Sequence, residues 1–196
     1  MTESAITPYR ILTVCTGNVC RSPAAERLLV QALGPSIVVR SAGTRALIGD
    51  PIHPPMAELL HAAGIDAGHF QATQLSESTV RQADLILTLA REHRASVVDL
   101  WPGAVRRTFT LTEFARAVQL VDPAQLPDDG TAAERLMAAT PQAAVLRGQI
   151  VPSTPEDDDV IDPYHREPQV YRESFSAIRQ AVTAIADSAN GRYGNT

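Results

Sequence analysis

A cysteine and an arginine lie six positions apart in the segment CTGNVCRS, which runs from Cys15 to Ser22. A thiolate is a strong nucleophile, and a guanidinium fork can hold two oxygens of a tetrahedral oxyanion at once. Between Cys15 and Arg21 stand Gly17 and Asn18, two residue types that enter the left-handed backbone region at small cost. They let the segment curl, so that its backbone N–H groups point inward as an anion nest. The spacing therefore predicts attack by Cys15 on a phosphoryl group that Arg21 holds.

The rest of this loop is expected to surround the bound anion. Ser22 can donate a hydrogen bond to the sulfur, which would steady the thiolate as it departs in a second step. We expect the following residues to contact the phosphoryl group: Thr16, Gly17, Asn18, Val19, Cys20 and Ser22. Alone, a cysteine is usually a small buried side chain and an arginine usually faces solvent. Cysteine, five residues, arginine and serine between a strand and a helix favour the catalytic interpretation.

Such a loop needs a strand before it and a helix after it. Residues 10–14 form a short apolar run rich in β-formers, and it ends at Cys15. Residues 23–33 have apolar side chains at helical spacing, and Gly34 closes them. The loop is therefore expected at the carboxyl end of a strand and the N-terminus of a helix, where open α/β sheets bind anions.

Strands and helices alternate along the rest of the chain. Further strands are predicted at 37–40, 84–89 and 105–109, and further helices at 55–63, 91–100, 111–118 and 169–186. Right-handed βαβ units build a parallel sheet, so the sequence predicts a doubly wound α/β fold.

Residues 119–159 interrupt this alternation with sequence rich in Pro, Asp and Ala. We interpret them as an insertion, with one helix predicted at 132–146, because they are too short to form a core of their own. Their acidic end, 156–159, is expected to be solvated, and residues 190–196 are expected to form a disordered tail.

Composition sets limits on partners and compartment. The 196 residues, 44% of them hydrophobic, suffice for one compact domain over residues 1–196. The formal charge of -5 gives no general attraction for nucleic acid or an anionic membrane. Without an apolar run of about 20 residues or the apolar core of a signal peptide, a cytoplasmic protein is expected. Two cysteines and five scattered histidines predict neither a disulfide framework nor a metal or other cofactor.

The segment ILTVCTGNVCRSPAAERLL resembles the signature of the low-molecular-weight protein-tyrosine phosphatases of bacterial type. Further matching motifs follow in order: SAGT at 41–44, GID at 64–66, DLILTLAREHR at 84–94 and DPY at 162–164. The resemblance implies a single flavodoxin-like three-layer domain whose four-stranded parallel sheet is flanked by helices. It also implies a cysteinyl-phosphate intermediate, no metal, and a hydrogen bond from Ser41 to Asn18 that holds the loop.

Cleavage of a phosphate ester needs a proton for the leaving oxygen, which a carboxylic acid can donate before it activates water as a base. Asp157, Asp158, Asp159 and Asp162 are available, and an acidic run of this kind is usually a solvated loop. Only Asp162 matches the Asp-Pro-Tyr motif of the family, so the resemblance makes it the general acid and base. Tyr164 would then offer an aromatic wall to a flat substrate ring.

Other positions match the family less closely. Leu47 stands where the family often places an aromatic residue over the pocket, which predicts a weaker grip on phosphotyrosine. A family histidine that supports the loop falls on His69 or on Phe70, depending on where the count begins. The other histidines are expected to be surface or hydrogen-bonded residues without a catalytic role: His53, His61, His93 and His165. Cys20 is close enough to Cys15 for a reversible disulfide, or it is a small buried side chain.

Together these features predict a protein-tyrosine phosphatase acting on a tyrosine-phosphorylated protein, such as a bacterial tyrosine kinase or a substrate of that kinase. An arsenate reductase that uses a small thiol is one alternative, since no cysteine follows Cys20 to relay through protein thiols. A protein-arginine phosphatase is another, although such relatives carry threonine where this chain has Val19. A catalytically inactive phosphate-binding adaptor is disfavoured by the complete set of Cys15, Arg21, Ser22 and Asp162.

Overall fold

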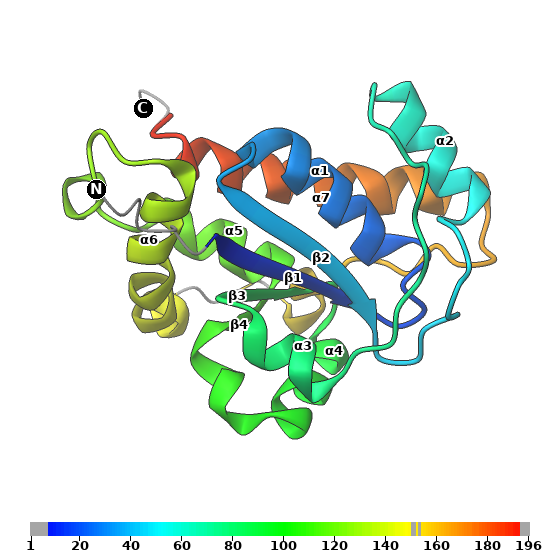
Figure 1. Cartoon of the computed structure of the whole chain (residues 1–196), viewed down its shortest axis with the longest axis horizontal. Helices are drawn as coiled ribbons and strands as arrows, with labels where there is room; N and C mark the ends of the chain where they lie inside the picture. Colours follow the sequence, from blue (N-terminus) through cyan, green and yellow to red (C-terminus); the bar gives the residue numbers. More distant parts are fainter. Residues whose placement is uncertain (1–7, 150–151, 153, 193–196) are drawn as a thin grey trace, which may run out of the picture.

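The computed structural model describes residues 8–149, 152 and 154–192. Figure 1 shows a central sheet of parallel strands with helices on both faces. The strands are β1 (Tyr9–Cys15), β2 (Ile37–Gly43), β3 (Leu85–Thr88) and β4 (Thr108–Thr110). They pair in the order β2-β1-β3-β4, and all pairs are parallel. The predicted four-stranded α/β domain is therefore confirmed.

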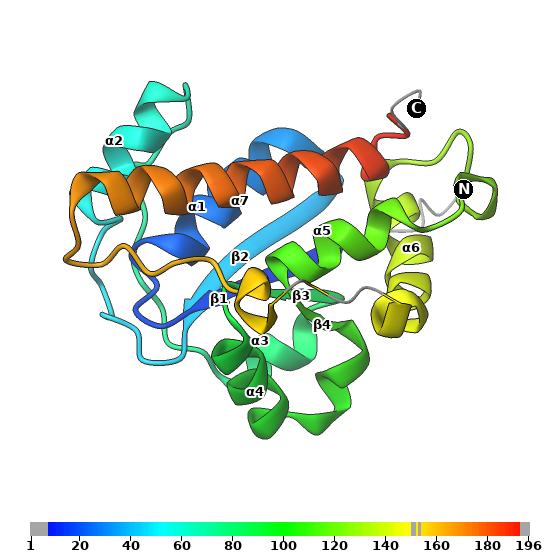
Figure 2. The same cartoon turned by 180° about the vertical axis from the view of Figure 1, so that it is seen from behind.

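Helices cover both faces of the sheet (Figures 1 and 2). The larger layer contains α1 (Arg21–Leu33), α2 (Pro54–Ala62), α5 (Leu111–Gln119), α6 (Ala132–Leu146) and α7 (Pro168–Ala189). The smaller layer contains α3 (Glu77–Gln82), α4 (Arg91–Leu100) and the 3-10 turn η1 (Pro102–Arg107). Within the described residues, no helix combines the length and the hydropathy that a bilayer crossing requires.

The strands are apolar almost throughout because both of their faces are covered. On β1, Ile11 packs into the larger core, while its neighbours Leu12 and Val14 pack into the smaller core against α3 and α4. Central β1 is also the point at which the topology reverses, since the chain adds β2 on one side of it and β3 on the other. A crevice for ligands is expected at the carboxyl ends of the strands at such a point.

Apart from small shifts in the bounds of several elements, the observed elements differ from the predicted ones most clearly in two places. The strand predicted at 105–109 is shifted, because η1 occupies Pro102–Arg107 and β4 begins only at Thr108, whose Oγ1 donates to the Ala104 carbonyl at 2.9 Å. Helix α3 was not predicted. It buries only Val80, so it has no apolar stripe, and a capping box between Ser76 and Thr79 starts it.

The described part of residues 119–159 packs onto the rest of the domain through α6, whose bounds match the predicted helix 132–146. Leu136 and Ala139 are buried in the larger core, and the Tyr9 hydroxyl lies 2.7 Å from Thr140 Oγ1. We propose that this segment is an insertion that shares the core of the single domain. Four of the residues predicted as a disordered tail, 193–196, lie outside the described part of the chain.

The prediction that the acidic run 156–159 is solvated is wrong in part. The Glu156 side chain is 74% exposed, but that of Asp158 is only 15% exposed and pairs with Arg116. Asp159 pairs with Arg91 at 3.0 Å, beside the 3-10 turn η4 (Pro155–Asp158). Two further 3-10 turns complete the fold, η2 (Pro123–Gln125) and η3 (Arg147–Gln149). The ion pairs of Asp158 and Asp159 therefore hold the run against the domain and fix the start of the chain that follows it.

Candidate active site

The loop between β1 and α1 has the curled form that the sequence predicts. Cys15 ends β1, Arg21 begins α1, and Cys15 Sγ lies 3.0 Å from Ser22 Oγ. The left-handed residue of the loop is Asn18, with φ of 55°, and Gly17 does not take a positive φ. The sulfur therefore sits at the base of a loop that ends at a helix N-terminus, the arrangement that favours an anion.

Asn18 joins three segments of the chain through one buried side chain. Its Nδ2 donates to Ser22 Oγ and to Ser41 Oγ, both at 2.9 Å, and its Oδ1 accepts from the Thr73 N–H at 2.8 Å. The hydrogen bond that the family resemblance implies between Ser41 and Asn18 is therefore present. Ser41 Oγ in turn donates to the Glu26 carboxylate. These bonds hold the backbone of the loop in its curled shape.

The segment that follows β2 runs alongside the same loop. Backbone N–H groups of Thr44, Arg45 and Leu47 donate to the carbonyls of Cys15, Thr16 and Gly17 at 2.9 to 3.0 Å. A Cβ on Gly43 would lie 2.5 Å from the Thr16 carbonyl oxygen, so only glycine permits this close approach. The arrangement brings the side chains of Arg45 and Leu47 to the mouth of the loop.

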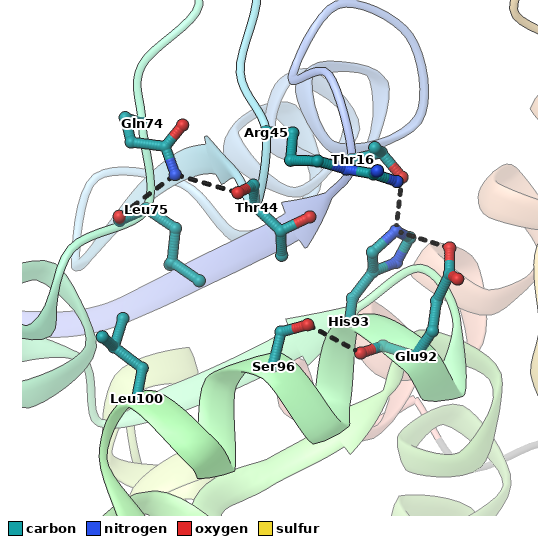
Figure 3. A pocket seen from close by; sticks show the side chains of 9 residues that line it. All are labelled: Thr16, Thr44, Arg45, Gln74, Leu75, Glu92, His93, Ser96 and Leu100. Carbon is teal, nitrogen blue, oxygen red and sulfur yellow. Dashed lines mark hydrogen bonds and ion pairs between the residues drawn. The ribbon is translucent and has the colours of Figure 1, made fainter.

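A histidine does support the loop, but it is His93, whereas the family match pointed to His69 or to the neighbouring Phe70. His69 is exposed, and within the described part of the chain no hydrogen bond joins it to the loop. His93, on the first turn of α4, is 1% exposed, and its Nε2 lies 2.8 Å from Thr16 Oγ1 (Figure 3). As expected, it is a hydrogen-bonded histidine. His93 follows β3, and the carboxyl ends of parallel strands meet at one edge of the sheet. This position could have indicated that His93 lies near the loop.

Burial, together with the nearby Arg21 guanidinium, lowers the pKa of His93 to about 4. A histidine in the unfolded chain titrates near pH 6.5, so the unfolded state binds a proton that the folded state rejects between these values. Its Nδ1 is also buried and has no partner among the described residues. His93 is therefore neutral at physiological pH and costs stability when the solution is acidified.

We expect His93→Asn to flatten the pH dependence of stability. In the parent protein, His93 should remove about 3 kcal/mol from the free energy of unfolding as the pH falls from 6.5 to 4, and the neutral amide should not. Urea unfolding at pH 7.5, 5.5 and 4.5 measures the difference. His61→Asn, at an exposed position, is the matched control. Equal slopes for the parent and His93→Asn would contradict the assignment.

Arg21 and Asp162 form an ion pair at the base of the crevice. Arg21 Nη2 lies 2.7 Å from Asp162 Oδ2, and Nη1 donates to the Val160 carbonyl at 3.1 Å. The Arg21 side chain is 5% exposed, whereas that of Asp162 is 51% exposed. The carboxyl group is thus open to solvent on one side and next to the Arg21 guanidinium on the other.

Asp162 takes its place because the chain before it is anchored to the sheet. The Val160 N–H donates to the Leu89 carbonyl at 2.9 Å, at the end of β3. Asp159 Oδ1 accepts from the Arg91 N–H at 2.7 Å, at the N-terminus of α4. Burial alone would raise the pKa of Asp159, but hydrogen bonds from Arg91 lower it on balance. Of the four candidate aspartates, only Asp162 therefore faces the loop.

These groups line one cavity of about 270 Å³. Its lining residues are Cys15, Thr16, Gly17, Val19, Cys20, Arg21, Arg45, Leu47, Asp162 and Tyr164. All but Arg45 were predicted, and Arg45 was missed because a lone exposed arginine carries no signal of its own. The predicted contact residues Asn18 and Ser22 lie fully buried behind this lining. Leu47 and Tyr164, each 36% exposed, form two walls of the opening.

His53, expected to have no catalytic role, supports one of these walls. Its ring lies 5.2 Å from the Tyr164 ring, edge to face, and its Nδ1 is 2.9 Å from the Tyr171 hydroxyl. Its backbone N–H donates to the Val19 carbonyl at 2.8 Å, so the same residue also holds the loop. Burial and the nearby His165 lower the pKa of His53, which favours its neutral form.

Cys20 differs from Cys15 in its surroundings although both thiols are free and buried. Burial, and then the proximity of Cys15, raise the pKa of Cys20 to about 12. Cys20 is therefore a protonated thiol at neutral pH and a poor nucleophile. The disulfide between the two cysteines stays a prediction. Within the described residues, no group of three His, Cys, Asp or Glu side chains could hold a metal ion.

Residues 10–135 match the family model described as low molecular weight phosphotyrosine protein phosphatase. The chain belongs to this family. Members of the phosphatase family are phosphoric monoester hydrolases, and the matched segment contains the whole loop from Cys15 to Ser22. The matched segment ends before Asp162, so the family match does not cover that residue.

Relatives of this low-molecular-weight phosphatase include proteins named for two substrates. A protein-arginine-phosphatase of Geobacillus stearothermophilus is 37% identical over 118 residues, which are 59% of this chain and 79% of that protein. The tyrosine phosphatase Wzb of Salmonella typhi is 38% identical over 114 residues, 58% of this chain and 76% of that protein. The solved structure of YwlE arginine phosphatase from Geobacillus stearothermophilus matches with a TM-score of 0.69 and 28% identity, covering 94% of each chain.

Proposed function

We propose that this phosphatase hydrolyses phosphotyrosine in a protein substrate. The observation that carries the proposal is the convergence of a thiol, a guanidinium and a carboxyl group on one cavity, at a helix N-terminus. Cys15 supplies the nucleophile, Arg21 the phosphate clamp, and Asp162 the general acid and base. The loop residues Thr16, Gly17, Val19 and Cys20 provide the backbone cradle around the phosphoryl group.

In the first step, the Cys15 thiolate attacks phosphorus. A P–S bond forms while the ester P–O bond breaks, and Asp162 donates its proton to the departing oxygen. Arg21 holds two non-bridging oxygens as the transition state develops, and the inward N–H groups of the loop stabilise the same charge. The product of this step is a cysteinyl phosphate and a free hydroxyl compound.

In the second step, water attacks the phosphorus of the cysteinyl phosphate. Asp162 now accepts a proton from that water, the P–S bond breaks, and inorganic phosphate and the thiolate are released. Ser22 Oγ, 3.0 Å from the sulfur, donates a hydrogen bond that stabilises the departing thiolate. The carboxyl group then carries the proton required for the next cycle.

The walls of the cavity support an aromatic ester as substrate. Val19, Leu47 and Tyr164 present apolar or aromatic surface beside the thiol, which suits a flat ring. The substrate is proposed to be a tyrosine-phosphorylated protein, such as a bacterial tyrosine kinase or its substrate. Two free cysteines fit the reducing cytoplasm proposed for it. Phosphoarginine is the second candidate, because one relative is named for that substrate.

A direct comparison of substrates tests this proposal. Initial rates should be measured for a phosphotyrosine peptide and for a phosphoarginine peptide of otherwise identical sequence, with arsenate reduction measured in the presence of a small thiol. We expect kcat/KM for phosphotyrosine to exceed that for phosphoarginine by at least about tenfold, a difference of about 1.4 kcal/mol in transition-state binding. Preference for phosphoarginine or arsenate would overturn the substrate, and binding without turnover would indicate an adaptor.

A further inference from the structure

A second cavity of about 340 Å³ adjoins the catalytic one. The two cavities share Thr16 and Arg45, and Figure 3 shows the second one between the Thr44 and Gln74 side and helix α4. Leu75 and Leu100 give it apolar surface, and the catalytic mechanism uses neither residue. A ligand in the catalytic cavity would therefore have a preformed recess directly beside it.

The polar walls of this recess are fixed by bonds among themselves. Gln74 Nε2 donates to the Thr44 carbonyl at 3.0 Å, and Gln74 Oε1 accepts from the Ala46 N–H at 3.0 Å. Ser96 Oγ donates to the Glu92 carbonyl at 3.0 Å (Figure 3). Because these polar groups already have hydrogen-bond partners within the protein, they define the shape of the recess rather than offer hydrogen bonds to a ligand.

Arg45 is different. Its backbone N–H is fixed by the Thr16 carbonyl at 2.9 Å, but within the described residues its guanidinium forms neither a hydrogen bond nor an ion pair. Glu92 is the one carboxylate among the described residues that line the recess; its side chain is 71% exposed, and its Oε1 lies 3.4 Å from His93 Nε2, beside the ring in Figure 3. The available charge on the wall nearest the phosphate loop is therefore positive.

We propose that this second cavity is a substrate subsite that receives an acidic side chain next to the phosphotyrosine in the polypeptide. The inference rests on the proposed function. An extended chain advances about 3.3 to 3.6 Å per residue, so a residue one or two positions away can reach a cavity that shares a wall with the first. Arg45 would bind the carboxylate, and Leu75 and Leu100 would contact the methylene groups of a glutamate.

Matched phosphotyrosine peptides test the subsite. Peptides that differ only in Glu, Gln or Lys at one position, from two before to two after the phosphotyrosine, should be compared by kcat/KM, with phenyl phosphate as reference. At one of these positions we expect Glu to exceed Gln by about two- to fivefold, as for a solvent-exposed charge pair. The ratio should fall towards one at high salt. Equal values for Glu, Gln and Lys at every position would overturn the subsite.

Three variants assign the preference to residues. Arg45→Gln should bring the Glu-to-Gln ratio close to one, whereas Arg40→Gln, an exposed arginine on β2, should keep it. Glu92→Gln should raise the ratio, because Glu92 is the one described lining residue of the recess whose negative charge would repel the glutamate of the peptide. Retention of the preference in Arg45→Gln would overturn the proposal. A flat peptide series with normal hydrolysis of phenyl phosphate overturns the subsite alone, whereas absence of phenyl phosphate hydrolysis overturns the proposed function as well.

Discussion

Replacement of Cys15 by serine is expected to reduce hydrolysis of phenyl phosphate by at least about 10⁴-fold, as for the loss of other covalent nucleophiles. A serine hydroxyl is not ionised near neutral pH, and among the described residues no basic group is hydrogen-bonded to the Cys15 side chain to activate it. The neighbour of Cys15 Sγ is the Ser22 hydroxyl at 3.0 Å, which can donate a hydrogen bond but cannot remove a proton. Initial rates and trapping of a phosphorylated protein from the parent and the variant measure the effect.

The serine variant should still bind oxyanions. Arg21 and the N–H groups of the loop are unchanged by the substitution, so inorganic phosphate should bind with a Kd within a few-fold of the parent value in calorimetry. Cys20→Ala removes the other thiol and controls for a general effect of thiol loss. Undiminished turnover by Cys15→Ser, or a trapped phosphoprotein in that variant, would show that another residue is the nucleophile.

Asp162→Asn is expected to lower kcat for phenyl phosphate by about 10² to 10⁴-fold, the usual contribution of a general acid. The amide can still accept the hydrogen bond from Arg21 Nη2 that the carboxylate accepts at 2.7 Å, so the loop should keep its place. It cannot donate a proton to the leaving oxygen. Steady-state kinetics over aryl phosphates of graded leaving-group acidity should show the greatest loss for the poorest leaving groups.

Asp157→Asn is the matched control within the same acidic run. Asp157 Oδ2 accepts from the Thr154 N–H at 2.9 Å and caps its own turn, away from the lining of the catalytic cavity. This variant should change kcat by less than about threefold for all leaving groups, in keeping with a substitution on an exposed turn. A small and uniform loss for Asp162→Asn would remove that residue from the chemistry.

The parts of the site that are local in sequence could be predicted from it. Strand, loop and helix follow one another within residues 9–33, so apolar spacing placed Cys15 at a strand end and Arg21 just before a helix, which in the structure begins at Arg21 itself. The helices at 91–100 and 132–146 were also predicted with their observed bounds.

Features that depend on distant contacts could not be obtained in this way. His93 supports Thr16 from 77 positions away, whereas counting along a loop pointed to His69. The acidic run looked solvated, since nothing nearby in sequence reveals that Arg116 and Arg91 meet it across the fold. Arg45 could not be identified from the sequence either. It lines both cavities only because the fold places the segment after β2 between them.

Asn18 shows how the fold prepares the loop for its ligand. One buried amide side chain connects the loop, β2 and the segment at Thr73 through three hydrogen bonds, two of them fully buried. The conformational freedom of the loop is therefore lost when the protein folds, before any anion arrives. An oxyanion that enters the cavity would then lose mainly its own freedom and its hydration, because the loop is already held in place by the bonds of Asn18. The entropy cost of ordering the loop is therefore part of the free energy of folding and does not reduce the affinity for a phosphoryl group.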